Sequence, residues 1–141
     1  MKQLIYTLLF NLLVNLAFSQ TGSITVKIEG ISSTKGKVEI GLYNKKENFT
    51  IYSKNFKGAS ITPSNNGITY TFENLPVGNY AIATWQDENE NKKIDKNWFG
   101  IPNEKYGFSL NKYGTFGPPD FDSVSFKVSD GKSTKLTIQL K

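Results

Sequence analysis

Apolar and polar side chains alternate in segment after segment of this chain, and no segment after residue 20 has the spacing of an amphipathic helix. A period of two is typical of a β-strand with one buried face. The pattern covers residues 23–30, 37–43, 56–61, 68–73, 81–85, 123–129 and 133–140. These segments predict an all-β fold, a single antiparallel β-sandwich of approximately seven strands. We expect 23–30 and 37–43 to form an antiparallel hairpin.

The turn between the fourth and fifth segments carries a longer signature. Residues 72–80 read FENLPVGNY, with Pro76 and Gly78 in the turn. A strand, this sequence and a second strand resemble the prealbumin-like (Ig-like) sandwiches of the carboxypeptidase regulatory and collagen-adhesin B-type repeats. The resemblance implies a fold but not a function.

The first 19 residues have the form of a secretory signal peptide. Lys2 precedes a short apolar run, and small residues at Ala17 and Ser19 suit a cleavage site. The alternative is a membrane anchor, but Asn11 and Asn15 interrupt the run, which is shorter than the roughly 20 residues a spanning helix needs. We therefore predict a signal peptide at 1–19, one domain at 20–141, export to the periplasm or the medium, and no membrane span after cleavage.

The missing residue types exclude whole mechanisms. The chain has no Cys and no His. Thiol nucleophiles, disulfides and Ser-His-Asp triads are therefore impossible, and zinc, copper and haem lose their usual ligands. The formal net charge is +5, but the lysines are scattered rather than grouped. Scattered lysines favour solubility over nucleic-acid binding, so we predict no nucleic-acid partner.

Residues 86–121 interrupt the strand pattern and predict one long ordered loop. Side-chain oxygens recur at alternate positions as this loop begins. The predicted calcium ligands are Asp87, Asn89, Asn91, the carbonyl of Lys93, Asp95 and, from farther along, Glu104. This is the spacing of a calcium loop, although Lys92 stands where such loops have Gly. The alternative is an Asx-rich turn whose side chains cap their own backbone amides without an ion.

The second half of the loop is rich in aromatic residues between glycines and prolines. The candidate ligand-binding side chains are Trp98, Tyr106, Phe108, Tyr113 and Phe116. They predict an aromatic platform for a glycan or a peptide. The alternative is that they pack onto the sandwich as buried anchors.

The loop also carries a wider family pattern. D-x-N-x-N-x-x-x-D starts at Asp87, F-G-I-P-x-E-x-Y-G-F-S ends at Ser109, and F-G-P-P-x-F follows at Phe116. On a sandwich with a signal peptide, these motifs resemble the exported bacterial proteins grouped as domain of unknown function 2141. The resemblance covers residues 24–140 and implies export and a β-sandwich. Members of that family generally have Gly at the position of Lys92.

These features together predict an exported, non-enzymatic module, stabilised by calcium, with a binding or structural role at the cell envelope. Its expected partner is a glycan or a protein. The alternative is a carbohydrate-active or carbohydrate-binding protein, in which Asp95 pairs with Glu104 or Asp120 and the aromatic residues hold a sugar.

Overall fold

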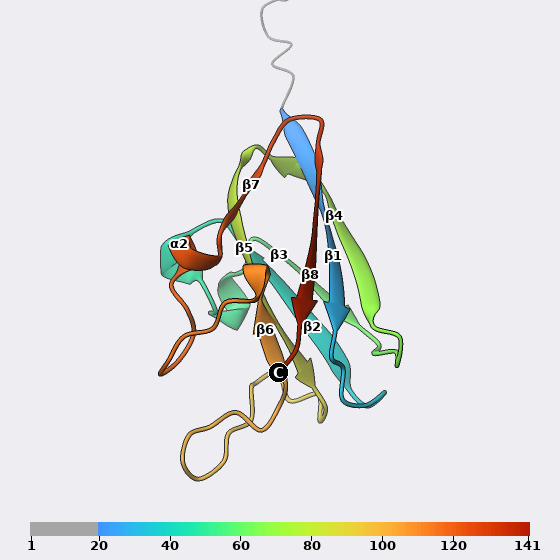
Figure 1. The fold of residues 1–141 in the computed structure, drawn as a ribbon, viewed down its shortest axis with the longest axis vertical. Helices are drawn as coiled ribbons and strands as arrows, with labels where there is room; N and C mark the ends of the chain where they lie inside the picture. The colour runs from blue at the N-terminus through green and yellow to red at the C-terminus, as the bar shows by residue number, and fades with distance from the viewer. Residues whose placement is uncertain (1–19) are drawn as a thin grey trace, which may run out of the picture.

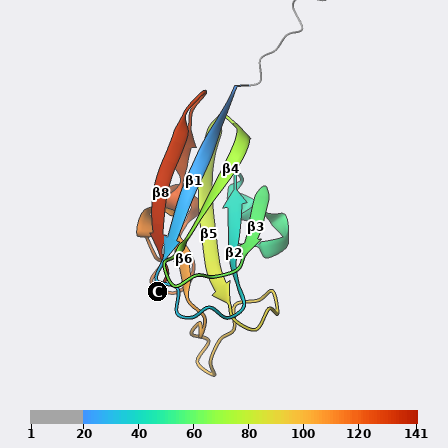
Figure 2. The same ribbon diagram turned by 90° about the vertical axis from the view of Figure 1, so that its right-hand side faces the viewer.

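The computed structural model describes residues 20–141, so the predicted signal peptide lies outside the described residues. Two β-sheets pack face to face (Figures 1 and 2). The strands are β1 (Thr21–Glu29), β2 (Lys37–Tyr43), β3 (Lys57–Ile61), β4 (Ile68–Pro76), β5 (Gly78–Asp87), β6 (Tyr106–Phe108), β7 (Phe126–Val128) and β8 (Ser133–Gln139). The predicted all-β sandwich is confirmed, with eight strands rather than approximately seven.

The sheets have three and five strands. The smaller has the order β4-β1-β8, and the larger has the order β3-β2-β5-β6, with β7 also paired to β5. The short helical segments are η1 (Lys46–Asn48), η2 (Tyr52–Lys54), η3 (Ser109–Asn111) and α2 (Phe121–Val124). No helix within residues 20–141 is long and apolar enough to cross a membrane.

Two expectations about strand pairing are wrong. β1 and β2 do not form a hairpin, because β1 pairs with β4 and β8 whereas β2 pairs with β3 and β5. The sandwich is also not wholly antiparallel, since β1 and β8 run parallel. Both differences have one cause: alternation identifies the buried face of a strand but not its partner.

The core lies between the sheets. It contains the inward side chains of every long strand, among them Ile24, Val26, Ile40, Ile82 and Ile138, each 0–2% exposed. A second apolar cluster covers the other face of the five-stranded sheet. It brings together Tyr43, Ala81, Ala83, Phe108, Phe121 and Val124.

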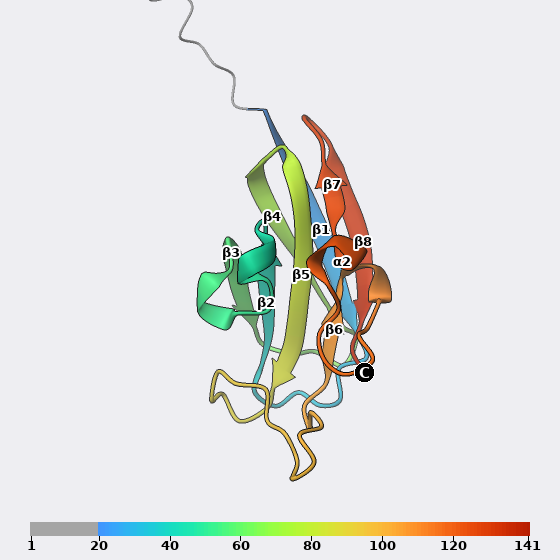
Figure 3. The ribbon, with the colours of Figure 1, turned by 90° about the vertical axis from the view of Figure 1, so that its left-hand side faces the viewer.

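The predicted loop 86–121 is not structureless. β6 adds to the edge of β5, with Ala83 opposite Phe108 and Trp85 opposite Tyr106. The loop before β6 extends past one end of the sandwich (Figures 1 and 3), and α2 covers the outer face of β5. The predicted strand 123–129 is shorter than expected, because its first residues belong to α2.

Candidate functional site

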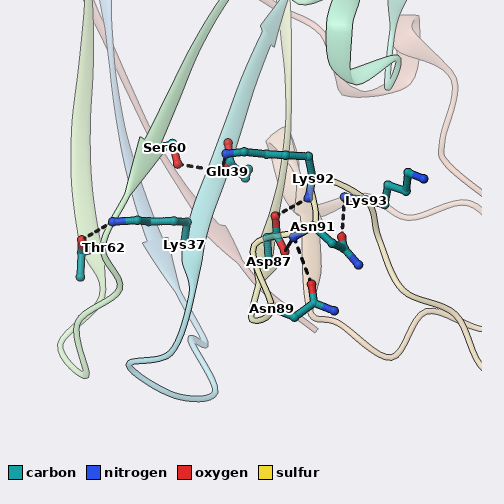
Figure 4. Close-up of polar contacts among 9 residues, drawn as sticks. All are labelled: Lys37, Glu39, Ser60, Thr62, Asp87, Asn89, Asn91, Lys92 and Lys93. Atoms are coloured by element: carbon teal, nitrogen blue, oxygen red, sulfur yellow. Dashed lines mark hydrogen bonds and ion pairs between the residues drawn. The ribbon is translucent and has the colours of Figure 1, made fainter.

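Asp87 is the anchor of the calcium-like loop. It ends β5 and is 0% exposed. Its two carboxylate oxygens accept the backbone N–H groups of Asn91 at 3.0 Å and Lys92 at 2.8 Å (Figure 4). Such bonds satisfy a buried carboxylate and wrap the following chain around it.

Asn89, Asn91 and Asp95 converge above that anchor. The amide groups of Asn89 and Asn91 donate to the two oxygens of Asp95, at 2.6 and 2.9 Å. Their own amide oxygens accept backbone N–H groups, from Asn91 at 3.2 Å and from Lys93 at 2.8 Å. The alternating oxygens therefore do meet, and the loop closes through Asx turns.

Glu104 joins the same cluster from the far side of the loop. Its two oxygens accept the backbone N–H groups of Glu88 at 3.0 Å and Asp95 at 3.1 Å. The side chain is 8% exposed, and its burial is the main cause that raises the pKa of its carboxyl above the usual value. Glu104 thus fastens both ends of the turn that carries the other predicted ligands.

The fit to a cation is incomplete in this conformation. Within residues 20–141, no three Asp or Glu side chains are grouped closely enough to hold a metal ion. Asp95 contacts two amide NH₂ groups, and a cation would have to replace those contacts with coordination by carboxylate and amide oxygens. Calcium accepts such oxygen ligands. The residues present can supply them only if both Asn side chains turn.

Lys92 links this cluster to the sheet. Its Nζ lies 2.8 Å from Oε1 of Glu39 on β2, which also accepts the hydroxyl of Ser60 at 2.7 Å (Figure 4). Glu39 is only 4% exposed, so the ammonium group pairs with a buried carboxylate. Sequence reasoning missed Glu39, because it lies on an ordinary strand pattern far from Lys92 in the chain.

The predicted aromatic platform divides into two groups. Tyr106, Phe108 and Tyr113 pack edge to face on one another, with ring centroids 5.8–6.0 Å apart. They belong to the apolar cluster on the outer face of the sheet. The interpretation that the aromatic residues pack onto the sandwich therefore describes these three.

The second group of aromatic side chains projects into solvent. Trp98, Phe99 and Phe116 each keep at least 84% of their surface exposed. Phe99, Ile101 and Phe116 border a groove of about 470 Å³. We call Trp98, Phe99, Ile101 and Phe116 the exposed aromatic surface.

Ser109 fixes the chain that follows β6. It is 0% exposed, and its hydroxyl accepts the N–H of Ile82 at 3.0 Å and donates to the carbonyl of Val124 at 2.6 Å. One side chain thus joins β5, η3 and α2. Its only signal in the sequence is its place at the end of the motif that finishes with G-F-S.

The chain is similar to a known protein family. A model described as "Uncharacterized protein conserved in bacteria (DUF2141)" matches residues 26–137. The chain belongs to this family. The match spans both sheets, the Asx-rich cluster and the exposed aromatic surface, so this DUF2141 member carries all of them within one family domain. No curated protein and no solved structure matches the chain.

Proposed function

We propose that this DUF2141 protein is an exported, non-enzymatic binding module that contacts a partner at the cell envelope through the exposed aromatic surface. The observation that carries the proposal is the exposure of Trp98, Phe99 and Phe116, at least 84% each. Large apolar patches of this kind on soluble proteins mark interaction sites, and aromatic residues supply much of the binding energy at such sites.

The backbone around this surface supports a preformed site. The Asn97 side chain accepts the N–H groups of Phe99 at 2.9 Å and Ile101 at 3.0 Å. Lys96 and Pro102 form a β-bridge across the same turn. A held turn loses less conformational entropy on binding than a free one. Trp98 and Phe99 are therefore presented on a closed turn.

Calcium is the cofactor proposed for this loop. Asp87, Asn89, Asn91 and Asp95 converge, and Glu104 lies against the backbone of Asp95. Calcium coordination would stabilise the turn directly before the one that carries Trp98. An ion present at about 100 times its Kd adds about 2.7 kcal/mol to the free energy of unfolding.

The calcium proposal is tested with EDTA-treated protein. Adding calcium should raise the melting temperature, and terbium should luminesce through energy transfer from Trp85 or Trp98, the two tryptophans that flank the cluster in the sequence. Asp95→Asn should abolish both effects. Asp120→Asn, a matched change of an exposed carboxylate outside the cluster, should leave both unchanged. No response in the unsubstituted protein would remove calcium from the proposal.

The binding proposal is tested by sedimentation with purified bacterial cell envelopes. The unsubstituted protein should sediment with the envelopes, and the double variant Trp98→Ala/Phe116→Ala should stay in solution. Ile51→Ala, which shortens an apolar side chain 41% exposed elsewhere on the surface, is the control. Equal sedimentation of the double variant would refute the assignment of the surface. Protease treatment of the envelopes then separates the two partner classes, since binding to a glycan survives it.

A further inference from the structure

A second candidate site lies on the outer face of the five-stranded sheet and meets the groove beside the exposed aromatic surface, with Ile94, Lys96 and Tyr106 among the residues common to both. Two adjoining hollows of about 320 and 380 Å³ share Tyr43, Tyr52 and Trp85 in their walls. Volumes of this size suit a small molecule. We call the two hollows together the outer-face groove.

The sequence forms the floor of this groove by placing small residues on neighbouring strands. Gly41 on β2 lies opposite Gly58 on β3 and Ala83 on β5. This row of small residues runs beside a row of larger ones, in which Glu39 lies opposite Ser60 and Trp85. The strand register therefore creates a depression bordered by polar and aromatic side chains.

The groove holds a buried acceptor. Glu39 lines the first hollow and is 4% exposed. Its Oε1 atom accepts hydrogen bonds from Ser60 at 2.7 Å and Lys92 at 2.8 Å. No side chain in the described part of the molecule donates to Oε2. A carboxylate oxygen can accept more than one hydrogen bond, so Glu39 retains capacity for a ligand donor.

The groove also holds a buried donor with no partner. Trp85 is 7% exposed and lines both hollows, and among residues 20–141 nothing accepts a hydrogen bond from its indole N–H. Tyr52 covers its ring edge to face, with centroids 5.3 Å apart. A buried donor without a partner is costly and calls for an explanation, which a ligand acceptor supplies.

We propose that the outer-face groove binds a neutral, hydroxyl-rich ligand of the size of a monosaccharide. A hydroxyl group both donates and accepts, so one ring can donate to Glu39 and, once side chains that cover Trp85 such as Tyr52 move aside, accept from its buried N–H. An ammonium cation offers no acceptor to the indole N–H and is repelled by the ammonium group of Lys92. An anion is repelled by the carboxylate of Glu39. Tyr52, which is 43% exposed, offers aromatic surface to the apolar face of a sugar ring.

The test uses the mature chain, labelled with ¹⁵N, in the Trp98→Phe background. Trp85 is then the only tryptophan, because the chain has two. Methyl glucoside, methyl galactoside and N-acetylglucosamine are titrated as probes, with choline and acetate as the cationic and anionic comparisons. At least one sugar should shift the Trp85 indole N–H resonance in a saturable way, and choline and acetate should not.

Two variants locate the effect. Glu39→Gln keeps the volume of the side chain but removes its charge, and it should weaken sugar binding about tenfold. Glu73→Gln, a matched change on the other sheet, should leave binding unchanged. If Glu39→Gln does not fold, Tyr52→Ala serves instead, because Tyr52 is 43% exposed and its loss should also weaken binding.

Three results would overturn the proposal: no sugar shifts the Trp85 resonance, choline or acetate shifts it instead, or the sugar shift persists unchanged in Glu39→Gln (or in Tyr52→Ala where that variant replaces it). The exposed aromatic surface is already altered by Trp98→Phe. A sugar response in this background therefore cannot come from Trp98, and the two proposals fail separately.

Discussion

Replacing Ser109 with Ala removes the hydroxyl that joins β5 to α2. In the native chain this hydroxyl satisfies the N–H of Ile82 and the carbonyl of Val124 within the protein interior. A buried backbone group left without its partner costs about 1–3 kcal/mol. Partial relaxation at two such groups gives an expected loss of about 2–4 kcal/mol in the free energy of unfolding. For a domain of this size, that lowers the melting temperature by about 8–16 °C.

The assay is urea unfolding of Ser109→Ala beside a matched control. Ser125→Ala also removes a serine hydroxyl, but that hydroxyl is exposed and makes a 3.3 Å contact with the carbonyl of Asp122. The control should change the free energy of unfolding by less than about 0.5 kcal/mol. If Ser109→Ala unfolds like Ser125→Ala, the bridge contributes nothing and the reasoning is wrong.

Three further predictions concern pH, backbone strain and processing. Burial, followed by the charge of Tyr52, raises the pKa of Tyr43 from 10.0 to about 12. The contribution of neutral Tyr43 to the free energy of unfolding is therefore complete below pH 10 and is lost as the pH rises toward 12. In urea unfolding across that range, Tyr43→Phe should lose less stability than the unsubstituted protein. Gly36 and Gly131 both have positive φ, but only at Gly36 would a Cβ meet the backbone, 1.9 Å from the Asp87 carbonyl oxygen. Gly131→Ala should therefore cost about 1–2 kcal/mol in thermal melts and Gly36→Ala clearly more. Protein recovered from bacteria that express the full chain should have the intact mass of residues 20–141; a mass that includes residues 1–19 would contradict cleavage.

The strands could be predicted because larger apolar side chains alternate with polar or small ones along them, and this holds even for β2 and β5, which are buried on both faces. Their partners could not, because β1 meets β8 from the other end of the chain. β6 was missed for a different reason. It has only three residues, Gly107 among them, and it is held by pairing with β5 and by reciprocal bonds between Tyr106 and Lys141.

The cluster of oxygen-bearing side chains was predictable for a local reason. Asp87, Asn89, Asn91 and Asp95 lie within nine residues, so a tight turn suffices to bring them together. The partner of Lys92 was not predictable, because Glu39 is 53 residues away and is brought close only by the register of β2 and β5. Local spacing carries information about turns, whereas contacts across the sheet depend on the whole fold.

Lys92 occupies the position where calcium loops have Gly. From the sequence alone, a Lys in place of this Gly argues against tight coordination of calcium. In the structure, its backbone nevertheless adopts φ +64°, the left-handed conformation that Gly usually supplies there. Its side chain leaves the cluster and reaches Glu39. The sharp turn therefore survives the substitution, and the obstacles that Lys92 itself presents to a cation are backbone strain and a nearby positive charge.

Those two obstacles can be separated by a pair of variants. Lys92→Met removes the charge but keeps a side chain at positive φ, whereas Lys92→Gly removes both the charge and the strain. Terbium affinity, measured by luminescence, should therefore increase from the unsubstituted protein to Lys92→Met and again to Lys92→Gly. Equal affinities in all three would show that position 92 does not govern the site. Tightest binding by the unsubstituted protein would show instead that the Lys92–Glu39 pair holds the loop in its binding conformation.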